Sequence, residues 1–377
     1  MDPLTDQPPV RRVAPVNVVG AAATAFLPEQ DAMLDELVFD AVYGALRECG
    51  LRKQDLGLSV IASMDVLDGR SISSGLTNSA AGGYLADSFR VEGDAGLAII
   101  AAAQAIAAGD VEVAVAVGVH NPETSGDALA RRAFVEQISN LGFEPHFDRP
   151  VGLTANMTYA LHASHQLGRL GTDVTTMAEF AAAEINQGAG RARSIRPSAT
   201  TVEEVLASTP ISWPLHELML PAESTGAVAV VLASPARAGR CLGRDARLTG
   251  LGHATGEYTW SGNWLTGPEA TTRRAAQMAY AQARVTPEQV RLAEISAPTP
   301  ALHACYLDAL GAAPQSVNAS GGLRSNYPGL ANGGLRLLEV IEQLERHEAG
   351  TVGLSHSVDT ETGIVSEDAT VLIVEAA

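Results

Sequence analysis

The sequence predicts an α/β protein made of two copies of one strand–helix unit, with a long extra block in the first copy. Strand-like and helix-like segments alternate along the chain, and the order in the first half returns in the second. One helix-like segment, 93–108, carries apolar residues on every face, so it must be buried on every side. In an α/β protein this places a helix between two sheets.

The first copy alternates strands and helices from residue 16 onward. Its segments are 16–20, 32–48, 58–63, 71–84, 89–91, 93–108 and 112–119. The last of these is apolar almost throughout, which is typical of a strand that is covered on both faces. A valine-rich run at 227–233 closes the first copy.

The second copy repeats this order. Its segments are 247–252, 270–283, 315–317, 333–345, 351–356 and 369–375. The stretch VTPEQVRLAEIS after its first helix mirrors LRKQDLGLSVIAS in the first copy. We therefore expect two βαβαβαββ units, an N-terminal half at 13–240 and a C-terminal half at 241–377, after a disordered lead at 1–12.

Residues 120–222 have no counterpart in the second half. This insertion contains helix-like segments at 157–167 and 174–187. Insertions and loops on a regular core carry functional groups more often than the core does. We expect the insertion to be a substrate cap or an interface.

Composition disfavours several classes of function. The net charge of -18 and the sequence pI of about 4.9 disfavour a nucleic-acid partner, because a polyphosphate backbone would be repelled. The three cysteines show no CxxC spacing, so no metal site and no disulfide framework is predicted, and a reduced, cytoplasmic protein is expected. No apolar run reaches the roughly 18 residues of a membrane span, so no membrane partner is expected.

Several segments resemble the thiolase superfamily. They are STPISWPLHELMLPAESTGAVAVVLAS at 208–234, VNASGG at 317–322, DGRSIS at 68–73 and VEGDAG at 91–96. The resemblance is closest to the sterol-carrier-protein and lipid-transfer type of thiolase-like protein, and it covers nearly the whole chain from Val16. It implies the thiolase-like fold, a duplicated βαβαβαββ unit in a five-layer α/β/α/β/α sandwich.

The same resemblance implies the positions of the catalytic residues. In that family a cysteine nucleophile opens the first buried helix, and an ungapped comparison puts Glu92 at this position. The family's G-H-P histidine falls on Tyr327 in SNYPG, and its last C-x-G loop falls on SHSVDTETG, which contains His356 and Ser357. A catalytic set of Glu92, Tyr327 and His356 is therefore implied, without a cysteine acyl-enzyme.

Each catalytic candidate also has a structural explanation. Glu92 is either an active-site acid or base, or a partner of the positive helix end, whereas Asp94 is better suited to capping. Tyr327 either donates a proton to an enolate or is a packed aromatic residue. His356 is either catalytic, at a strand end, or structural. The substrate-binding candidates are His120, Ser296, Gly321, Gly322, Asn326, Ser357 and Arg193.

Arg193 belongs to a basic turn in an acidic chain. In the family, the insertion contacts the nucleotide end of coenzyme A, and arginine suits phosphate recognition. The alternative is a solvated turn without a ligand. No cofactor is expected other than coenzyme A as part of the substrate.

Three functions remain open on the sequence alone. The first is an enzyme of lipid metabolism that forms or cleaves C–C bonds in an acyl-CoA or related thioester by aldol or Claisen chemistry, or transfers an acyl group. In the aldol scheme Tyr327 and His356 move protons, and backbone N–H groups at the buried helices stabilise the enolate. The second is a non-catalytic subunit, and the third is an acyl-binding carrier. The resemblance implies a homodimer or a heterodimer with a thiolase paralogue, and a small OB-fold/zinc-ribbon protein as a further partner.

Overall fold

Ten strands form one continuous sheet that is folded into two halves. The computed structural model describes residues 14–69, 71–83, 86–122, 127–256, 263–359 and 368–377, and the predicted lead at 1–12 lies outside them. The two halves of the sheet join where Val16–Val18 pairs antiparallel with Ala246–Leu248. Among the described residues, no helix is both long enough and apolar enough to cross a bilayer.

The first half of the sheet contains five strands. They are β1 (Val16–Ala23), β2 (Leu58–Ala62), β3 (Asp87–Val91), β4 (Val113–His120) and β7 (Gly226–Ala233). Their order across the sheet is β3-β2-β4-β7-β1. Strand β2 is parallel to β3 and β4, while β7 is antiparallel to β4 and β1.

The second half of the sheet repeats this topology. Its strands are β8 (Ala246–Thr255), β9 (Val290–Ile295), β10 (Ser316–Val317), β11 (Val352–Val358) and β12 (Asp368–Ala376). The order β10-β9-β11-β12-β8 matches the first half strand for strand, and so do the parallel and antiparallel pairings. The repeat in the sequence is therefore a repeat in the fold.

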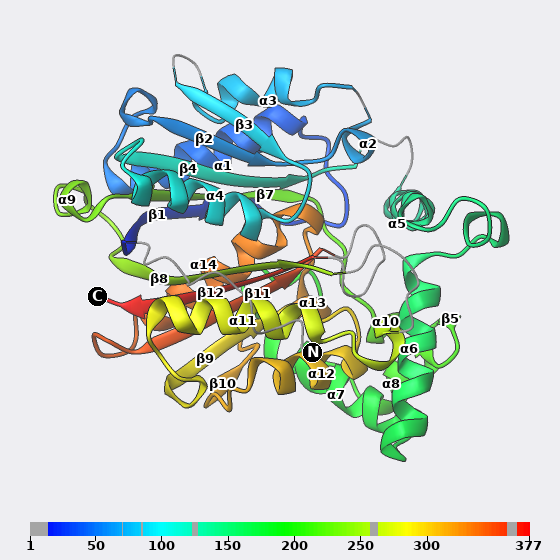
Figure 1. Ribbon diagram of the computed structural model, residues 1–377. Coiled ribbons are helices and arrows are strands. Elements are labelled where there is room, and N and C mark those ends of the chain that lie inside the picture. The colour runs from blue at the N-terminus through cyan, green and yellow to red at the C-terminus, as the bar shows by residue number, and fades with distance from the viewer. Residues whose placement is uncertain (1–13, 70, 84–85, 123–126, 257–262, 360–367) are drawn as a thin grey trace.

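Helices separate and cover the two halves of the sheet, so the molecule has five layers (Figure 1). The outer helices of the first half are α1 (Leu34–Cys49) and α3 (Ser74–Ala80). The central pair is α4 (Ala95–Ala108) and α14 (Asn332–Leu344), and the outer helices of the second half are α11 (Ala270–Ala283) and α12 (Pro300–Leu310). The five-layer α/β/α/β/α prediction is confirmed.

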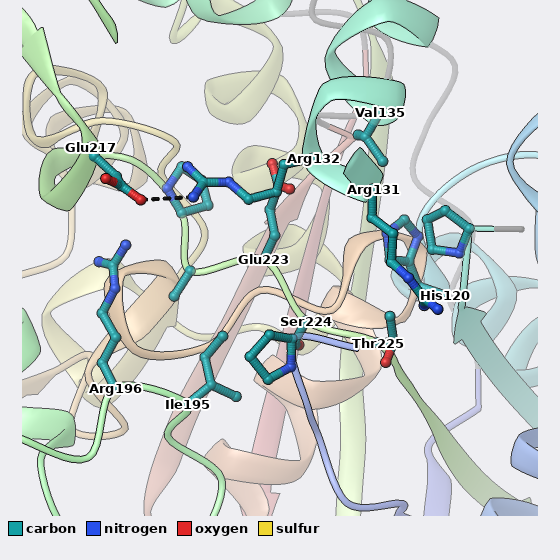
Figure 2. Close-up of a pocket in the computed structure, with 14 residues that line it drawn as sticks. His120, Arg131, Arg132, Val135, Ile195, Arg196, Glu217, Glu223, Ser224 and Thr225 are labelled. Atoms are coloured by element: carbon teal, nitrogen blue, oxygen red, sulfur yellow. Dashed lines mark hydrogen bonds and ion pairs between the residues drawn. The ribbon is translucent and has the colours of Figure 1, made fainter. Parts of the chain in front are cut away.

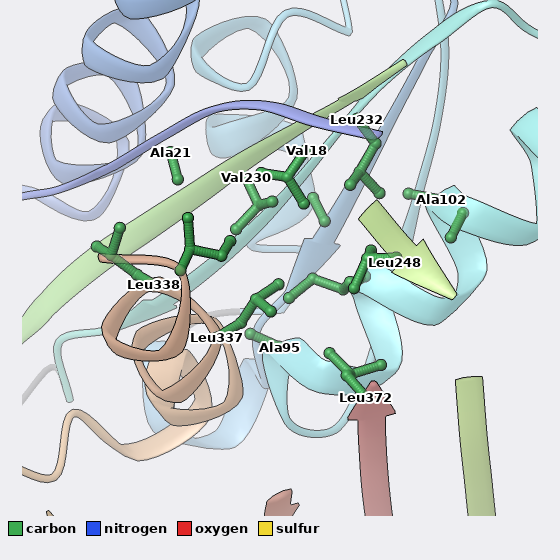
Figure 3. Close-up of a cluster of buried hydrophobic side chains, with 14 of the residues drawn as sticks. Val18, Ala21, Ala95, Ala102, Val230, Leu232, Leu248, Leu337, Leu338 and Leu372 are labelled. Carbon is green, nitrogen blue, oxygen red and sulfur yellow. The ribbon is translucent and has the colours of Figure 1, made fainter. Parts of the chain in front are cut away.

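The central helices are buried because residues of both sheet halves pack on them. Ala95 and Ala102 of α4 and Leu337 of α14 share one apolar cluster with Val230 of β7 and Leu372 of β12 (Figure 3). This arrangement confirms the prediction that the alanine-rich helix lies between two sheets. Burying apolar surface on every side is the main stabilising contribution that this layer makes.

The insertion forms a helical subdomain beside the second half of the core. Its elements are α5 (Ala128–Ser139), η2 (Asn140–Gly142), η3 (Arg149–Val151), α6 (Ala155–Leu170), α7 (Val174–Gly188), α8 (Val202–Ala207), β5 (Pro210–Ser212), β6 (Leu215–His216) and η4 (Glu217–Met219). Helices α6 and α7 pack against α12, within an apolar cluster that also holds residues of β11 and β12. The two predicted helices of the insertion are confirmed, and α5 and α8 are additional ones.

The remaining elements are short. They are η1 (Lys53–Asp55), α2 (Asp65–Asp68), α9 (Pro235–Ala238), α10 (Asn263–Thr266), η5 (Pro287–Gln289), α13 (Gly322–Ser325) and η6 (Gly329–Ala331). The glycine-rich stretch around Tyr327 therefore forms α13, η6 and the first turn of α14. This stretch links β10 to the central layer.

Candidate functional site

The first turns of the two central helices meet at one buried carboxylate, Asp94. Its Oδ1 accepts hydrogen bonds from Gly96 N at 2.8 Å and from Ser357 Oγ at 2.6 Å. Its Oδ2 accepts from Gly333 N at 2.8 Å, in the first turn of α14. Asp94 is the N-cap of α4 and also satisfies a backbone donor at the start of the second central helix.

Burial raises the pKa of Asp94 to about 6, although the hydrogen bonds from Ser357, Gly96 and Gly333 act in the opposite direction. Because Asp94 occupies the Gly96 and Gly333 N–H groups, these donors are already used within the protein. The expectation that such helix-end N–H groups stabilise an enolate is therefore not supported at these two positions. Capping, which the sequence favoured for Asp94, is what the structure shows.

Glu92 lies at the surface, away from this cluster. Its Oε1 accepts a hydrogen bond from Arg90 Nη2 at 2.6 Å, and its side chain is 58% exposed. Strand β3 ends at Val91, and α4 begins only at Ala95, so Glu92 falls in the connecting turn. The implied position of Glu92, at the opening of the buried helix, is wrong, because the ungapped comparison ignored this turn.

His356 is fully buried but points to the other face of β11. Side chains alternate along a strand, so Ser357 faces the central helices, while His356 faces α11 and α12. There His356 Nε2 lies 3.0 Å from Thr272 Oγ1, and its ring contacts Tyr306 edge-on at 5.1 Å between centroids. Burial lowers the pKa of His356 to about 3, so it is neutral at physiological pH. Glu92 thus lies at a surface turn, and His356 lies between β11 and the outer helices. The structure does not bring these two members of the implied catalytic set together.

Tyr327 sits where the glycine-rich stretch meets the end of the insertion. Its backbone N donates to Ala222 O at 2.8 Å, and its carbonyl accepts from Ser224 N at 2.9 Å. The residue is only 6% exposed. These backbone bonds hold Tyr327 in register beside Glu223.

Tyr327 lines a small pocket of about 30 Å³, which we call the tyrosine pocket. Its lining is Val135, Glu136, Ser139, Ala155, Asn156, Tyr159, Pro221, Glu223 and Tyr327. Glu136 is mostly buried, which raises the pKa of its carboxyl, and Asn156 Nδ2 donates to it at 2.5 Å. Two tyrosines and two glutamates therefore line one pocket, and the helices of the insertion form most of its wall.

A second pocket of about 210 Å³ adjoins the first and shares Val135, Pro221 and Glu223 with it (Figure 2). We call it the arginine pocket, and its other lining residues are Pro28, His120, Pro122, Arg131, Arg132, Ile195, Arg196, Glu217, Ala222, Ser224 and Thr225. His120, at the end of β4, is thus the substrate-binding candidate that this pocket contains. Gly329 leaves room for it, since a Cβ there would lie 2.2 Å from His120 Nδ1.

Other substrate-binding candidates make contacts within the protein. Ser296 Oγ accepts from Asn332 Nδ2 at 2.6 Å, beside the start of α14. Asn326 accepts from Ser224 Oγ at 2.6 Å and donates to Arg193 O at 2.8 Å. Gly321 and Gly322 have φ of 91° and 56°. These two glycines permit the left-handed turn that opens α13.

Arg193 forms ion pairs within the protein. Its guanidinium donates to Glu339 at 3.0 Å and to Glu342 at 2.6 Å and 2.8 Å, both on α14. The hydrogen bonds from Arg193 to Glu342 raise the pKa of the guanidinium. Arg193 therefore fastens the insertion to the central helix, a contact that the sequence did not reveal.

The three cysteines lie away from the first turn of α4. Cys49 ends α1, Cys305 lies in α12, and Cys241 follows α9. Burial raises the pKa of both Cys49 and Cys305 to about 11, which disfavours thiolate. Within the described ranges, no group of three or more histidine, cysteine or acidic side chains has the arrangement of a metal site.

Comparison with known proteins places this geometry in context. No model of a known protein family matches the chain. A curated acetyl-CoA acetyltransferase of Methanothermobacter thermautotrophicus is 26% identical over 383 residues, which covers 91% of this chain and 96% of that protein. The solved Ltp2-ChsH2(DUF35) aldolase superposes with a TM-score of 0.78 at 21% identity, covering 97% of this chain and 99% of that one.

A second solved structure, the acetyl-CoA acetyltransferase of Bacillus anthracis, superposes with a TM-score of 0.76 at 15% identity over 97% of this chain and all of that one. The chain has the thiolase fold. Its sequence is related to the thiolase family through the acetyltransferase match. In this thiolase fold the first turn of α4 carries Asp94, and the two pockets lie where the insertion meets the segment 221–225.

Sequence reasoning missed the residues that the insertion adds to these pockets. Arg131, Arg132 and Glu136 lie on α5, a helix with only weak amphipathic character in the sequence. Glu223 could have been identified from the sequence. It is an acidic residue directly after the predicted insertion and shortly before a buried strand. Its pairing with Tyr327 depends on the tertiary fold.

Proposed function

We propose that the protein is an enzyme that breaks or forms a carbon–carbon bond in an acyl-CoA or related thioester by aldol chemistry, without a cysteine acyl-enzyme. The relationship to a protein named acetyl-CoA acetyltransferase supports a thioester substrate. The fold shared with a protein named as an aldolase supports carbon–carbon chemistry. The positions of the three cysteines, all outside the first turn of α4, support a mechanism without a thiolate nucleophile.

The observation that carries the proposal is the grouping of Tyr327, Glu136 and Glu223 around one pocket. Aldol chemistry needs a group that takes a hydroxyl proton and a group that supports an enolate oxygen. A carboxylate with a raised pKa suits the first task, and Glu136 has this property because of burial. A tyrosine hydroxyl, with an ordinary pKa of about 10, suits the second because it stays protonated and donates a hydrogen bond.

In the cleavage direction the reaction balances without a redox step. A carboxylate takes the proton of the β-hydroxyl group, the bond between Cα and Cβ breaks, and a carbonyl compound leaves. The electron pair of that bond enters the thioester as an enolate, whose oxygen accepts a hydrogen bond from Tyr327. The enolate then takes a proton at Cα, which gives a shortened acyl thioester. Coenzyme A takes part only as the carrier of the acyl group.

An activity screen tests this proposal. Purified protein is incubated with a β-hydroxyacyl-CoA series and with acyl-CoA plus aldehyde, and the released carbonyl compound and thioester are measured by mass spectrometry. The expected result is interconversion of these pools with no acyl adduct on the intact protein after acid quench. A stable acyl adduct on a cysteine, with turnover that depends on it, would contradict the proposal.

A second candidate is a non-catalytic subunit of a hetero-oligomeric enzyme. It is favoured by apolar side chains that the insertion leaves exposed, because such groups are common where a partner binds. Leu129, Phe147 and Val151 are 72%, 78% and 76% exposed. The proposed partners are a thiolase paralogue or a small OB-fold/zinc-ribbon protein, and a second copy of this chain is the homodimeric alternative.

The screen separates these functions when it is run with and without a candidate partner. Turnover by the isolated protein supports the enzyme. Turnover that appears only with the partner and survives Tyr327→Phe supports the subunit. Size-exclusion chromatography of the protein with the partner, and of Phe147→Ser as a variant of the exposed surface, reports the complex directly.

A further inference from the structure

More arginines than carboxylates line the arginine pocket. Arg131 and Arg132 of α5 and Arg196 of the turn before α8 line it, against two carboxylates, Glu217 and Glu223. Its lining therefore has an excess of cations in a chain whose net charge is -18. Such a local reversal of charge concentrates anions near the pocket.

Arg196, like Arg131, lines this pocket without an ion pair among the described residues, whereas Arg132 pairs with Glu217. Its Nη1 donates to Arg324 O at 3.0 Å and to Leu218 O at 3.5 Å, which are neutral carbonyls. Among the described residues Arg196 forms no ion pair within 4.0 Å, whereas its neighbour Arg193 binds two glutamates. Burial, with Arg324 and Arg132 nearby, lowers the pKa of Arg196 to about 10, so it remains a cation.

The other two arginines, Arg131 and Arg132, also bring N–H donors to this pocket. Arg132 Nη1 binds Glu217 Oε1 at 2.7 Å, and Figure 2 shows this pair on the side of the pocket where Arg196 lies. Arg131 donates through Nη1 to Asn121 at 2.8 Å, beside His120. Its Nε is buried and has no hydrogen-bond partner in the part of the chain that the structure describes. A buried donor of this kind favours a ligand that supplies an acceptor.

We infer that the arginine pocket binds an anionic oxygen group of the substrate, with Arg196 as its main partner and Arg131 and Arg132 in support. Arginine holds carboxylates and phosphates through paired donors, which gives direction as well as charge. This inference rests on the proposed function, because it specifies the substrate class of that site.

The position of the pocket favours a carboxylate on the acyl part over a phosphate of coenzyme A. The arginine pocket shares Val135, Pro221 and Glu223 with the tyrosine pocket, so a group bound there lies close to the reacting carbons. The phosphates of coenzyme A are separated from the thioester by the whole pantetheine arm. The substrate we expect is therefore a β-hydroxyacyl-CoA whose acyl chain carries a second carboxylate.

Binding of a simple anion tests the site without turnover. Wild-type protein and the variants Arg196→Gln and Arg240→Gln are titrated with glutarate by calorimetry at two salt concentrations. Arg240→Gln is the matched control, because it removes the same charge at an exposed position after α9, on the opposite side of the molecule from α5 (Figure 1). We expect Arg196→Gln to weaken glutarate binding roughly tenfold to a hundredfold, and Arg240→Gln to leave it unchanged. Equal affinity in all three proteins, or no binding by wild type, would overturn the inference.

The source of the anion is decided by matched substrates. Binding is compared for β-hydroxyacyl-CoA with and without a terminal carboxylate, and for each as its dephospho-CoA derivative. Loss of the terminal carboxylate should weaken binding to wild type but not to Arg196→Gln. If loss of the 3′-phosphate has that effect instead, the acyl carboxylate is excluded.

Two further results keep the test decisive. If Arg196→Gln does not fold, Arg196→Lys and Arg131→Gln take its place. Arg196→Lys retains the charge at this cavity and Arg131→Gln removes one, and both change the packing less. The failure of this inference can be told apart from the failure of the proposed function. If glutarate binding depends on Arg196 but no thioester is turned over, the anion site is supported and the proposed aldol activity is contradicted.

Discussion

The Ser357 hydroxyl donates to Asp94 Oδ1 at 2.6 Å, and this contact joins strand β11 of the C-terminal half to the start of the first buried helix of the N-terminal half. Asp94 also binds Gly333 N, so one carboxylate connects β11, α4 and α14. The residues are 263 positions apart in sequence. The two copies of the fold therefore share a buried polar contact.

Asp94 makes stability depend on pH in a defined direction. Its pKa is raised from 3.8 to about 6 in the folded state, so the folded protein binds a proton more readily than the unfolded chain between these values. Its contribution to stability therefore falls as pH rises from about 4 to about 6. As pH falls through this window, the free energy of unfolding of wild type should increase relative to that of Asp94→Asn by up to about 3 kcal/mol. Denaturant titrations at pH 7 and pH 4.5 measure it, and a pH-independent difference would contradict it.

Gly333 must remain a glycine for this contact to form. A Cβ at this position would lie 2.0 Å from Asp94 Oδ1 and 2.5 Å from Gly96 N. We expect Gly333→Ala to destabilise the protein by about 3 kcal/mol, because neither neighbour can move in the buried layer. Gly168→Ala is the control: this α6 glycine has nothing within 4 Å of a new Cβ, so the substitution should stabilise by about 0.5–1 kcal/mol. Thermal melts of both variants report the contrast.

Glu92→Gln should have little effect. The side chain is at the surface and pairs only with Arg90 among the ion pairs found in the described residues, and most surface substitutions change stability by less than about 0.5 kcal/mol. Turnover of the substrate found in the screen should also stay within about twofold of wild type. A large fall in turnover at unchanged melting temperature would return Glu92 to the catalytic set.

His356 predicts the opposite pH dependence from Asp94. Burial lowers its pKa from 6.5 to about 3, so folding keeps it neutral while the unfolded chain takes up a proton. Its contribution is fully present above pH 6.5 and is lost as pH falls toward about 3. His356→Gln should therefore lose less stability than wild type on acidification from pH 7 to pH 4.5, whereas His347→Gln, at an exposed position, should follow wild type. Unfolding curves at both pH values decide this.

The sequence predicted the fold well because the fold depends on patterns that one chain displays. The uniform apolar character of 93–108 requires a helix between two layers. The repeated order of strands appears as the matching topologies β3-β2-β4-β7-β1 and β10-β9-β11-β12-β8. The site was predicted less well. Glu92 was placed by counting residues without a gap, and two residues of turn moved the carboxylate of the buried layer to Asp94.

His356 and the α5 residues show a further reason. Whether a strand residue faces one layer or the other changes at every position, so Ser357 and His356 have opposite environments although they are adjacent. The contribution of α5 to both pockets depends on how the insertion folds back on the core, and no periodicity in the sequence specifies that. Tyr327 was named through the resemblance alone, because the family's G-H-P histidine falls on it, and the structure places it on the wall of the tyrosine pocket.

The most direct test of the account is the turnover of β-hydroxyacyl-CoA by Tyr327→Phe. The account predicts a fall in kcat of roughly 100-fold to 10,000-fold with an unchanged melting temperature, because the variant loses the hydroxyl that supports the enolate. Tyr280→Phe is the matched buried tyrosine, whose hydroxyl donates to Leu310 O at 2.9 Å, and it should retain turnover. Wild-type turnover by Tyr327→Phe would contradict the assignment of the site.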